Sequence, residues 1–257
     1  MFATPGEAER AVMRLALISD IHGNNVALEA VLSQLPTQNV TQLICLGDIA
    51  STGPQPREVI KRLQEIDCSV VMGNMDAWLL QPEPRSQPDL RRQRWQDMDI
   101  WCAEQLSSAD RAYLRTFQPR IECPLPAEKM LLCYHGSPRS YIERILPTTP
   151  EEDLDQIFAR VGGDIKVGGH THIQMVRRFK DTLILNPGSI GLAMDRVSPL
   201  DEIRQPSWAE YAIVDCDETS LHLELHRIAF DLQTFLQAMN DSGMPHAAWW
   251  ASHWKKA

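Results

Sequence analysis

The sequence lacks a membrane-spanning run, a signal peptide and any surplus of positive charge. Its 257 residues include no apolar run of about 18 residues, the length that a transmembrane helix needs. The opening stretch, MFATPGEAERAVM, has neither the cationic flank nor the apolar region of a secretory signal. Its 34 acidic residues outnumber 25 basic ones, so the net charge is −9. Because a long nucleic acid requires a basic face, we expect neither a membrane nor a long nucleic acid as partner.

The six cysteines include no Cys-x-x-Cys pair. Most lie within apolar runs such as LICLGD and MLLCYHG, where cysteine behaves as a small hydrophobic residue. A reduced, cytoplasmic protein is therefore expected.

The composition, 44% hydrophobic and 23% charged, is that of a globular chain long enough to bury a sizeable core. There is no internal repeat and no long linker, so we expect a single domain over residues 13–257, with residues 1–12 loosely held. Nothing in the sequence decides whether the chain forms a homo-oligomer.

Short apolar runs alternate with amphipathic segments in the first third of the chain. Strands are predicted at 14–19, 41–46 and 68–72, and helices at 25–35 and 56–66. This alternation is typical of βαβ units, whose parallel sheet is covered on both faces.

A proline-rich loop and two helices, at 89–106 and 108–117, interrupt this pattern and form a helical insertion over about residues 82–118. The insertion carries Trp95 and Trp101. Two interpretations stay open: it packs its own aromatic residues, or it caps a substrate pocket.

Strand signals return in the second half. Strands are predicted at 121–123, 129–134, 164–168 and 182–186, a helix at 150–161, an antiparallel pair at 211–216 and 220–228, and helices at 230–240 and 245–254.

Five short polar motifs directly follow predicted strands. They are DIHGN at 20–24, GD at 47–48, GNMD at 73–76, HG at 135–136 and GHTH at 169–172. The loops at the carboxyl ends of strands converge in one crevice of an α/β sheet, and glycine permits the sharp turns. We therefore expect the polar side chains of these motifs to meet.

The motifs supply seven potential metal ligands: Asp20, His22, Asp48, Asn74, His135, His170 and His172. Oxygen and imidazole ligands without thiolate favour Mn, Fe, Zn, Ni or Co. Seven ligands exceed what one tetrahedral ion needs, and with one bridging aspartate they divide between two divalent ions. Two ions about 3.5–4 Å apart are the usual clamp for in-line attack at phosphorus.

The other four histidines lack this context. His222 and His226 alternate with leucines on a predicted strand, and His246 and His253 lie in a tryptophan-rich tail. We interpret all four as structural or solvated.

The ordered motifs resemble those of the calcineurin-like metallophosphoesterases, over residues 14–214. They are most similar to a small bacterial and archaeal branch that reads DIHGN, GD followed by Gly-Pro (53–54 here), HGSPR (135–139), GHTH and NPGS (186–189). The resemblance implies a four-layer α/β/β/α sandwich with a di-metal site at the strand ends.

The resemblance also implies the division of the ligands. One ion would be held by Asp20, His22, Asp48 and His172, and the other by Asp48, Asn74, His135 and His170. Asp48 would then be the bridge, and Mn²⁺ is the favoured metal.

One position departs from the family pattern, which commonly reads GNH followed by Asp or Glu. Met75 occupies the place of a histidine that can protonate the leaving group, and a thioether cannot donate a proton. The catalytic acid is thus unassigned. Asp76 is a weak candidate for orienting a water or a ligand histidine, with a helix N-terminal carboxylate as the equal alternative.

Three residues are candidates for substrate contact. Asn74 lies among the ligands, Arg139 could clamp a phosphate oxygen or pair with a surface acid, and Ser189 follows a Pro-Gly turn whose role could be purely structural.

The sequence thus predicts a metal-dependent phosphoesterase, in which a metal-bridging hydroxide attacks phosphorus in small phosphodiesters or phosphomonoesters, nucleotides among them. The alternative is a weakly active or inactive scaffold on the same fold, favoured by Met75 and by aromatic residues of the tail (Trp249, Trp250, Trp254) that we expect to be exposed. The complete ligand set argues against the scaffold. An unrelated amidohydrolase is disfavoured because that class begins with HxH, whereas DxH comes first here.

Overall fold

The computed structural model describes residues 13–194 and 204–255. The expectation that residues 1–12 are loosely held therefore concerns a segment outside the described residues.

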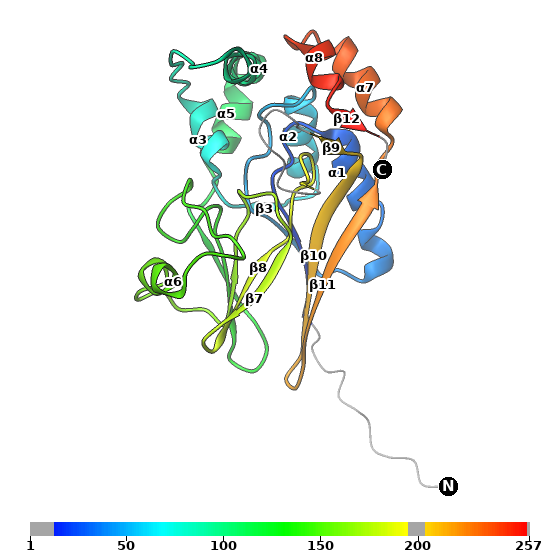
Figure 1. The fold of residues 1–257 in the computed structure, drawn as a ribbon. Coiled ribbons are helices and arrows are strands. Elements are labelled where there is room, and N and C mark those ends of the chain that lie inside the picture. The colour runs from blue at the N-terminus through cyan, green and yellow to red at the C-terminus, as the bar shows by residue number, and fades with distance from the viewer. Residues whose placement is uncertain (1–12, 195–203, 256–257) are drawn as a thin grey trace, which may run out of the picture.

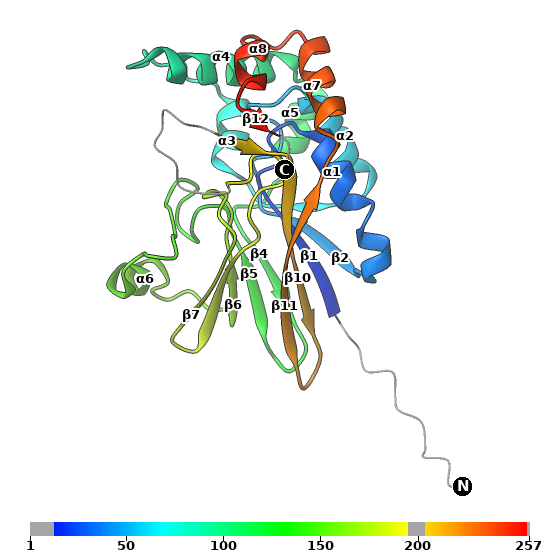
Figure 2. The same ribbon diagram turned by 45° about the vertical axis from the view of Figure 1, so that its right-hand side comes forward.

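Two five-stranded sheets form the centre of the fold (Figures 1 and 2). The first has the order β11-β10-β1-β2-β3, with bounds Leu221–Ala229, Trp208–Cys216, Met13–Ile18, Gln42–Cys45 and Ser69–Val70. In it, β1, β2 and β3 run parallel, while β10 is antiparallel to both β1 and β11. The predicted antiparallel pair is thus confirmed at the edge of this sheet.

The second sheet is also mixed, but it has an antiparallel strand at each edge. Its order is β4-β5-β6-β8-β7, with bounds Ile121–Pro124, Met130–Cys133, Ile165–Val167, Thr182–Asn186 and Met175–Phe179. Its three inner strands run parallel, and β4 and β7 close the two edges in antiparallel orientation.

Helices cover only the outer face of each sheet. Helices α1 (Asn25–Leu32) and α2 (Pro56–Glu65) pack on the first sheet, whereas α6 (Glu151–Ile157) packs on the second. The inner faces pack against each other through a buried apolar cluster that includes Leu15, Ile44, Leu131, Val167 and Val214. The order of layers is α/β/β/α, which confirms the expected four-layer sandwich.

The expected parallel strands are covered on both faces, by helices on the outer side and by the other sheet on the inner side, and each sheet also contains antiparallel strands. A strand that is apolar on both faces has the same pattern whether its second cover is a helix or another sheet. The sequence analysis also missed β7, whose segment MVRRF has two arginines at its centre. Charged side chains are common on edge strands because they discourage further pairing.

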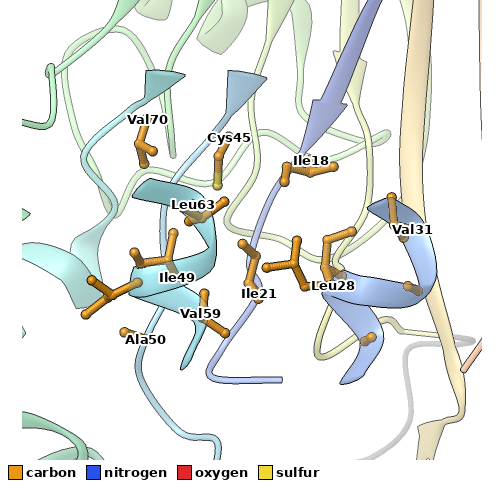
Figure 3. Close-up of a cluster of buried hydrophobic side chains, with 14 of the residues drawn as sticks. Ile18, Ile21, Leu28, Val31, Cys45, Ile49, Ala50, Val59, Leu63 and Val70 are labelled. Carbon is orange, nitrogen blue, oxygen red and sulfur yellow. The ribbon is translucent and has the colours of Figure 1, made fainter. Parts of the chain in front are cut away.

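The first βαβ units pack around residues that neighbour the polar motifs. Figure 3 shows Ile18 and Ile21 directed toward Leu28 of α1, and Ile49 near Val59 of α2. Ile21 separates Asp20 from His22, and Ile49 follows Asp48. Because these isoleucines are fully buried in the core, they anchor both polar loops to the first sheet.

The insertion contains α4 (Leu90–Gln105) and α5 (Ser108–Leu114), next to α3 (Asn74–Leu80). Both ribbon views place α4 at the same end of the molecule as the C-terminal helices α7 (Leu232–Asp241) and α8 (Ala247–Ala251). Its aromatic residues do not pack only among themselves, because Trp95 makes an edge contact with Trp250 of α8 at 6.4 Å between ring centroids.

The tail is correspondingly less exposed than expected. Trp250 and Trp254 are buried and Trp249 is half-buried, so the expectation of exposed tail aromatics is wrong. Trp250 contacts both Trp95 of α4 and Trp254 of the short strand β12 (Trp254–Lys255). Strand β12 pairs in parallel with β9 (Gln205–Pro206).

In the described parts of the chain, no helix combines the length and apolar character required of a membrane span. All six cysteines are buried free thiols.

We expect Leu15→Ala to destabilise the fold strongly. Leu15 is fully buried between the two sheets, and a Leu-to-Ala change at such a site typically costs about 2–5 kcal/mol. Leu225 is 40% exposed on edge strand β11, so Leu225→Ala should change the unfolding free energy by less than about 1 kcal/mol. Urea unfolding of both variants measures the difference, and equal losses would contradict an inter-sheet core.

Candidate metal centre

Loops from both sheets carry the polar motifs. Asp20 and His22 follow β1, Asp48 follows β2, and Asn74 begins α3 after β3. From the second sheet, His135 follows β5, and His170 and His172 follow β6. The site therefore lies where the carboxyl ends of parallel strands from two sheets meet.

The backbone of this region is unusually constrained. Five of the seven candidate ligands have positive φ angles without being glycine: Asp20 (54°), His22 (47°), Asp48 (53°), His170 (65°) and His172 (58°). Such conformations cost free energy and cluster at functional sites, where the surroundings hold them. Here the loops hold one another, since His22 N–H donates to the carbonyl of Asp48 at 3.0 Å and Asp20 N–H to that of Gly47 at 2.9 Å.

Two glycines permit the close approach of these loops. A Cβ atom on Gly73 would lie 2.2 Å from Asp48 Oδ1, and one on Gly169 would lie 2.0 Å from Ser19 Oγ and 2.8 Å from Asp20 Oδ2. Any side chain at either position would displace a candidate ligand carboxylate.

The side chains gather into two groups. Asp20, His22 and His172 form the first, and Asp48, His135 and His170 form the second. In each group, potential ligand atoms from all three residues lie within 4.8 Å of one another. This grouping agrees with the division of ligands that the resemblance implies.

Asp20 presents one oxygen to the first group. Its Oδ2 accepts hydrogen bonds from Ser19 Oγ at 2.6 Å and from the His170 amide at 2.9 Å. Its Oδ1 is buried, has no hydrogen-bond partner, and lies 3.2 Å from His172 Nε2 and 3.7 Å from His22 Nε2. A buried carboxylate oxygen without a donor is unfavourable unless a cation completes it, so this donor set fits a divalent metal.

Asp48 plays the equivalent part in the second group. Its Oδ1 accepts from the Met75 amide at 2.7 Å, and its Oδ2 lies 3.3 Å from His135 Nε2. Asn74 Oδ1 lies 3.0 Å from the same nitrogen and so joins this group. That Asp48 would bridge two ions remains a prediction.

The imidazole rings are oriented by their far nitrogens. Nδ1 of His135 donates to the carbonyl of Leu46 at 2.7 Å, and Nδ1 of His172 donates to that of Leu192 at 2.9 Å. Nδ1 of His22 lies 2.9 Å from Ser51 Oγ. Such contacts hold the proton on Nδ1 and leave Nε2 as the ligand atom, which is how metal-binding histidines are usually supported.

The charges at the site are strongly coupled. Burial opposes ionisation of Asp20, but the His172 and His22 rings outweigh it and hold the pKa of that carboxyl well below its usual range. Burial also opposes protonation of His135, yet Asp48 raises the pKa of this ring to about 10. Burial and the nearby His135 lower the pKa of His170. In the metal-free protein, the negative charges of the buried carboxylates thus favour protonation of the neighbouring imidazole rings.

Asp76 supports the site rather than facing it. Its carboxylate is fully buried and accepts hydrogen bonds from the amides of Asp48 (2.7 Å), Ile49 (2.9 Å) and Gly73 (2.9 Å). In the last contact, the side chain at the third position of α3 accepts from the amide of the N-cap residue Gly73, which is one of the two hydrogen bonds of a capping box. Asp76 is therefore the carboxylate at a helix N-terminus that the sequence offered as one alternative. Its hydrogen bonds also connect α3 to the loop that carries Asp48.

Two of the residues predicted to contact substrate, Arg139 and Ser189, instead bind other protein groups. The Arg139 guanidinium pairs with Glu143 through two contacts, at 2.9 and 2.6 Å, which is the acid-pairing alternative. Ser189 is fully buried, where its hydroxyl donates to the carbonyl of Asp20 and accepts from the amide of Leu192. The expectation that Ser189 contacts substrate is corrected, because it buttresses the Asp20 loop.

The four remaining histidines lie in neither ligand group. His222 is exposed, His226 stacks on Tyr211, His246 pairs with Asp97, and His253 contacts the carbonyl of Trp249. Their structural interpretation agrees with these contacts.

Sequence reasoning missed two polar residues beside the site. Ser51 could have been found, because it lies between the GD motif and the Gly-Pro turn in the same loop. Asp99 on α4 carried no signal, because a lone aspartate in an amphipathic helix is ordinarily solvated. In the structure it accepts a hydrogen bond from Thr52 Oγ1 at 2.7 Å.

Comparison with known proteins agrees with this geometry. The model of the calcineurin-like phosphoesterase superfamily domain matches residues 13–219. An uncharacterised protein of Methanocaldococcus jannaschii is 27% identical over 240 residues, which cover 90% of this chain and 93% of that protein.

Two crystal structures share the fold. A metallophosphoesterase from Sphaerobacter thermophilus superposes with a TM-score of 0.68 at 22% identity, covering 94% of this chain and 97% of its own. A hypothetical protein from Pyrococcus horikoshii gives a TM-score of 0.74 at 19% identity, covering 95% and 100%.

We expect metal binding to release protons and to weaken as the pH falls. His135 and His172 have raised pKa values because Asp48 and Asp20 outweigh their burial, so near neutral pH a metal must displace protons from these rings. Calorimetric titration with Mn²⁺ in buffers of different ionisation enthalpy measures the protons released. His135→Ala should reduce their number, whereas exposed His222→Ala should not; an affinity that is flat between pH 6 and 8 would contradict this site.

We expect Ser51→Ala to weaken metal binding without removing a ligand. Loss of the Oγ contact frees the His22 ring, and loss of such a supporting contact typically lowers metal affinity about 10–100-fold. Ser33→Ala, an exposed change at the end of α1, is the matched control. Equal affinities for both variants would show that Ser51 does not orient His22.

Proposed function

The chain belongs to the calcineurin-like phosphoesterase superfamily, and from this premise we propose that it is a metal-dependent hydrolase of small phosphate esters. Its seven ligands would be Asp20, His22, Asp48, Asn74, His135, His170 and His172, shared between two divalent ions with Asp48 as the bridge. The single observation that carries the proposal is the buried Asp20 Oδ1, which accepts from no backbone amide or hydroxyl and lies 3.2 Å from His172 Nε2 and 3.7 Å from His22 Nε2.

When bound, two divalent ions would supply Lewis-acid stabilisation and an acidified water for in-line attack at phosphorus. The protein's own groups do the positioning: the carbonyls of Leu46 and Leu192 and the Ser51 hydroxyl orient three rings, and Asp76 holds the loop that carries Asp48. Two carboxylates and an amide supply oxygen donors of the kind that suit Mn²⁺, beside four imidazoles, and Mn²⁺ is the metal that we favour for this site.

The substrate would be a small phosphodiester or phosphomonoester, with nucleotides included. Arg139, the arginine of the HGSPR motif, is committed to Glu143, so the phosphate charge would be met chiefly by the ions. The chain as a whole carries a net charge of −9, which disfavours long nucleic acids as substrates.

Of the two observations that favoured an inactive scaffold, Met75 and exposed aromatic residues in the tail, the structure does not support the second. Trp250 and Trp254 are buried in the fold and therefore do not offer an exposed aromatic surface to a partner. Met75 remains in its favour, since a thioether cannot protonate a leaving group. Yet the neighbours of Met75 retain the complete polar set, which a pure scaffold does not need.

We expect Mn²⁺-loaded protein to hydrolyse bis-p-nitrophenyl phosphate, and EDTA to abolish the reaction. Asp48→Asn should lower kcat/KM by at least about 10²-fold, because the ions supply several kcal/mol of transition-state stabilisation. Release of p-nitrophenolate measures the rate.

Asp153→Asn is the matched control, an exposed aspartate on α6 that should leave the rate unchanged. The absence of turnover with Mn²⁺, Fe²⁺, Zn²⁺, Ni²⁺ and Co²⁺ would contradict the hydrolase proposal and would support an inactive scaffold on the same fold. Turnover that continues after EDTA treatment would show that the reaction does not require a metal.

A further inference from the structure

Helix α4 carries two aspartates in opposite environments. Asp97 is paired, with Oδ2 2.8 Å from His246 Nε2 and Oδ1 accepting from Gln93 Nε2 at 2.7 Å. Asp99, two residues along, is half-buried and accepts a hydrogen bond from the Thr52 hydroxyl. No described cationic side chain forms an ion pair with Asp99. A carboxyl removed from water without a cation is a candidate for function rather than for stability.

Thr52 places Asp99 at the edge of the candidate metal centre. It lies in the loop that begins with Asp48, directly after Ser51, whose hydroxyl contacts the His22 ring at 2.9 Å. On its other side, Gly53 is so close to His22 that a Cβ there would lie 1.9 Å from the His22 carbonyl oxygen. Both neighbours of Thr52 therefore touch a candidate ligand residue, and Asp99 bonds to the residue between them.

The loop is strained at this point and α4 holds it. Thr52 has a φ of 64°, which is rare for a β-branched residue. Asp99 holds its side chain, and Cys102 Sγ, one turn further along α4, donates to the carbonyl of Gly53 at 3.4 Å. Strain that neighbouring contacts maintain is characteristic of residues at a reaction centre.

We propose that Asp99 protonates the leaving oxygen of the phosphate ester, the role that Met75 cannot fill. This inference rests on the proposed hydrolase function. As water oxygen bonds to phosphorus, the bond from phosphorus to the leaving oxygen breaks and its electron pair stays on that oxygen. The Asp99 carboxyl gives its proton to the oxygen, so the alcohol departs neutral and Asp99 becomes a carboxylate. The proton lost by the attacking water passes to solvent, from which Asp99 is reprotonated.

The environment keeps this acid protonated near neutral pH. Burial, and after it the charge of Asp48, raise the pKa of Asp99 to about 7. Among the described residues, Asp48 and Cys102 are the titratable groups that interact with it; α2 and α3, which also contact α4, contribute none to this shift. Burial is the larger cause and persists when bound metal offsets Asp48. A general acid is most effective when its pKa lies near the working pH.

The decisive experiment compares leaving groups. The Mn²⁺-loaded wild type, Asp99→Asn and Asp97→Asn are assayed on a series of aryl phosphodiesters from p-nitrophenyl to p-methoxyphenyl and on an alkyl phosphodiester. Asp99→Asn should lower kcat/KM about 10²–10⁴-fold for the alkyl ester, the usual range for losing a general acid, and only a few-fold for the p-nitrophenyl ester. The rate should also become more sensitive to the leaving-group pKa, and the decline of the rate at high pH should disappear.

Asp97→Asn is the matched control, being the same change on the same helix. It should leave the leaving-group dependence unchanged, and Asp99→Glu should recover part of the alkyl-ester activity. Equal loss on all esters in Asp99→Asn, with an unchanged pH profile, would overturn the proposal while leaving the hydrolase function intact. An inactive wild type would instead overturn the hydrolase function and this inference with it.

A measurement without substrate provides an independent readout. In metal-free protein labelled with ¹³C-aspartate, two carboxyl resonances should titrate near pH 7, because burial raises the pKa of both Asp76 and Asp99 to about 7. One of the two should be absent in Asp99→Asn, and both should persist in Asp97→Asn. An Asp99 carboxyl that titrates in the ordinary acid range would overturn its role as an acid.

Discussion

The structure depends on two carboxylates, Asp20 and Asp48, that are removed from water at the meeting point of two sheets. An ionised carboxylate in such a place is strongly unfavourable unless cations or hydrogen bonds compensate it. One oxygen of each accepts amide or hydroxyl hydrogen bonds, and the other faces imidazole nitrogens. Proton-bearing rings provide this compensation in the metal-free protein, and the proposed metal ions would provide it in their place. The pair therefore links the stability of the site to whatever cation occupies it.

Holding these carboxylates in place requires a backbone that would not be stable in an isolated loop. Asp20, His22 and Asp48 all adopt left-handed conformations, and their loops are cross-linked by main-chain hydrogen bonds. Buried Ile21 and Ile49 extend from the same loops into the apolar core and anchor them. The free energy of burying this core offsets the local strain, which explains why the site lies on the ends of rigid strands rather than on free loops.

The sequence was most informative where local pattern and function coincide. Strand-end motifs such as GHTH predicted which side chains would meet, because parallel strands bring their carboxyl ends together whatever the tertiary detail. It was less informative where partners are distant in the chain. Whether Arg139 meets phosphate or Glu143, and whether Ser189 faces substrate or the Asp20 carbonyl, depends on loop geometry that no periodicity encodes. The division of the strands between two sheets came from the family resemblance and not from the apolar pattern, since a doubly buried strand does not reveal what covers it.

The helical insertion explains how one fold can change its chemistry without changing its metal ligands. In the proposed hydrolase, the residues on the strand ends would be constrained by the ions that they hold, so that replacement of a single acid, as at Met75, would leave them intact. A separate helix can then supply a proton donor from outside, provided that it is rigidly held. Helix α4 meets this condition, because Trp95 packs against Trp250 on the outer side, while Asp99 and Cys102 hydrogen-bond the loop beside His22. The C-terminal helices thus act on the site through α4, by fixing the position of the helix that borders it.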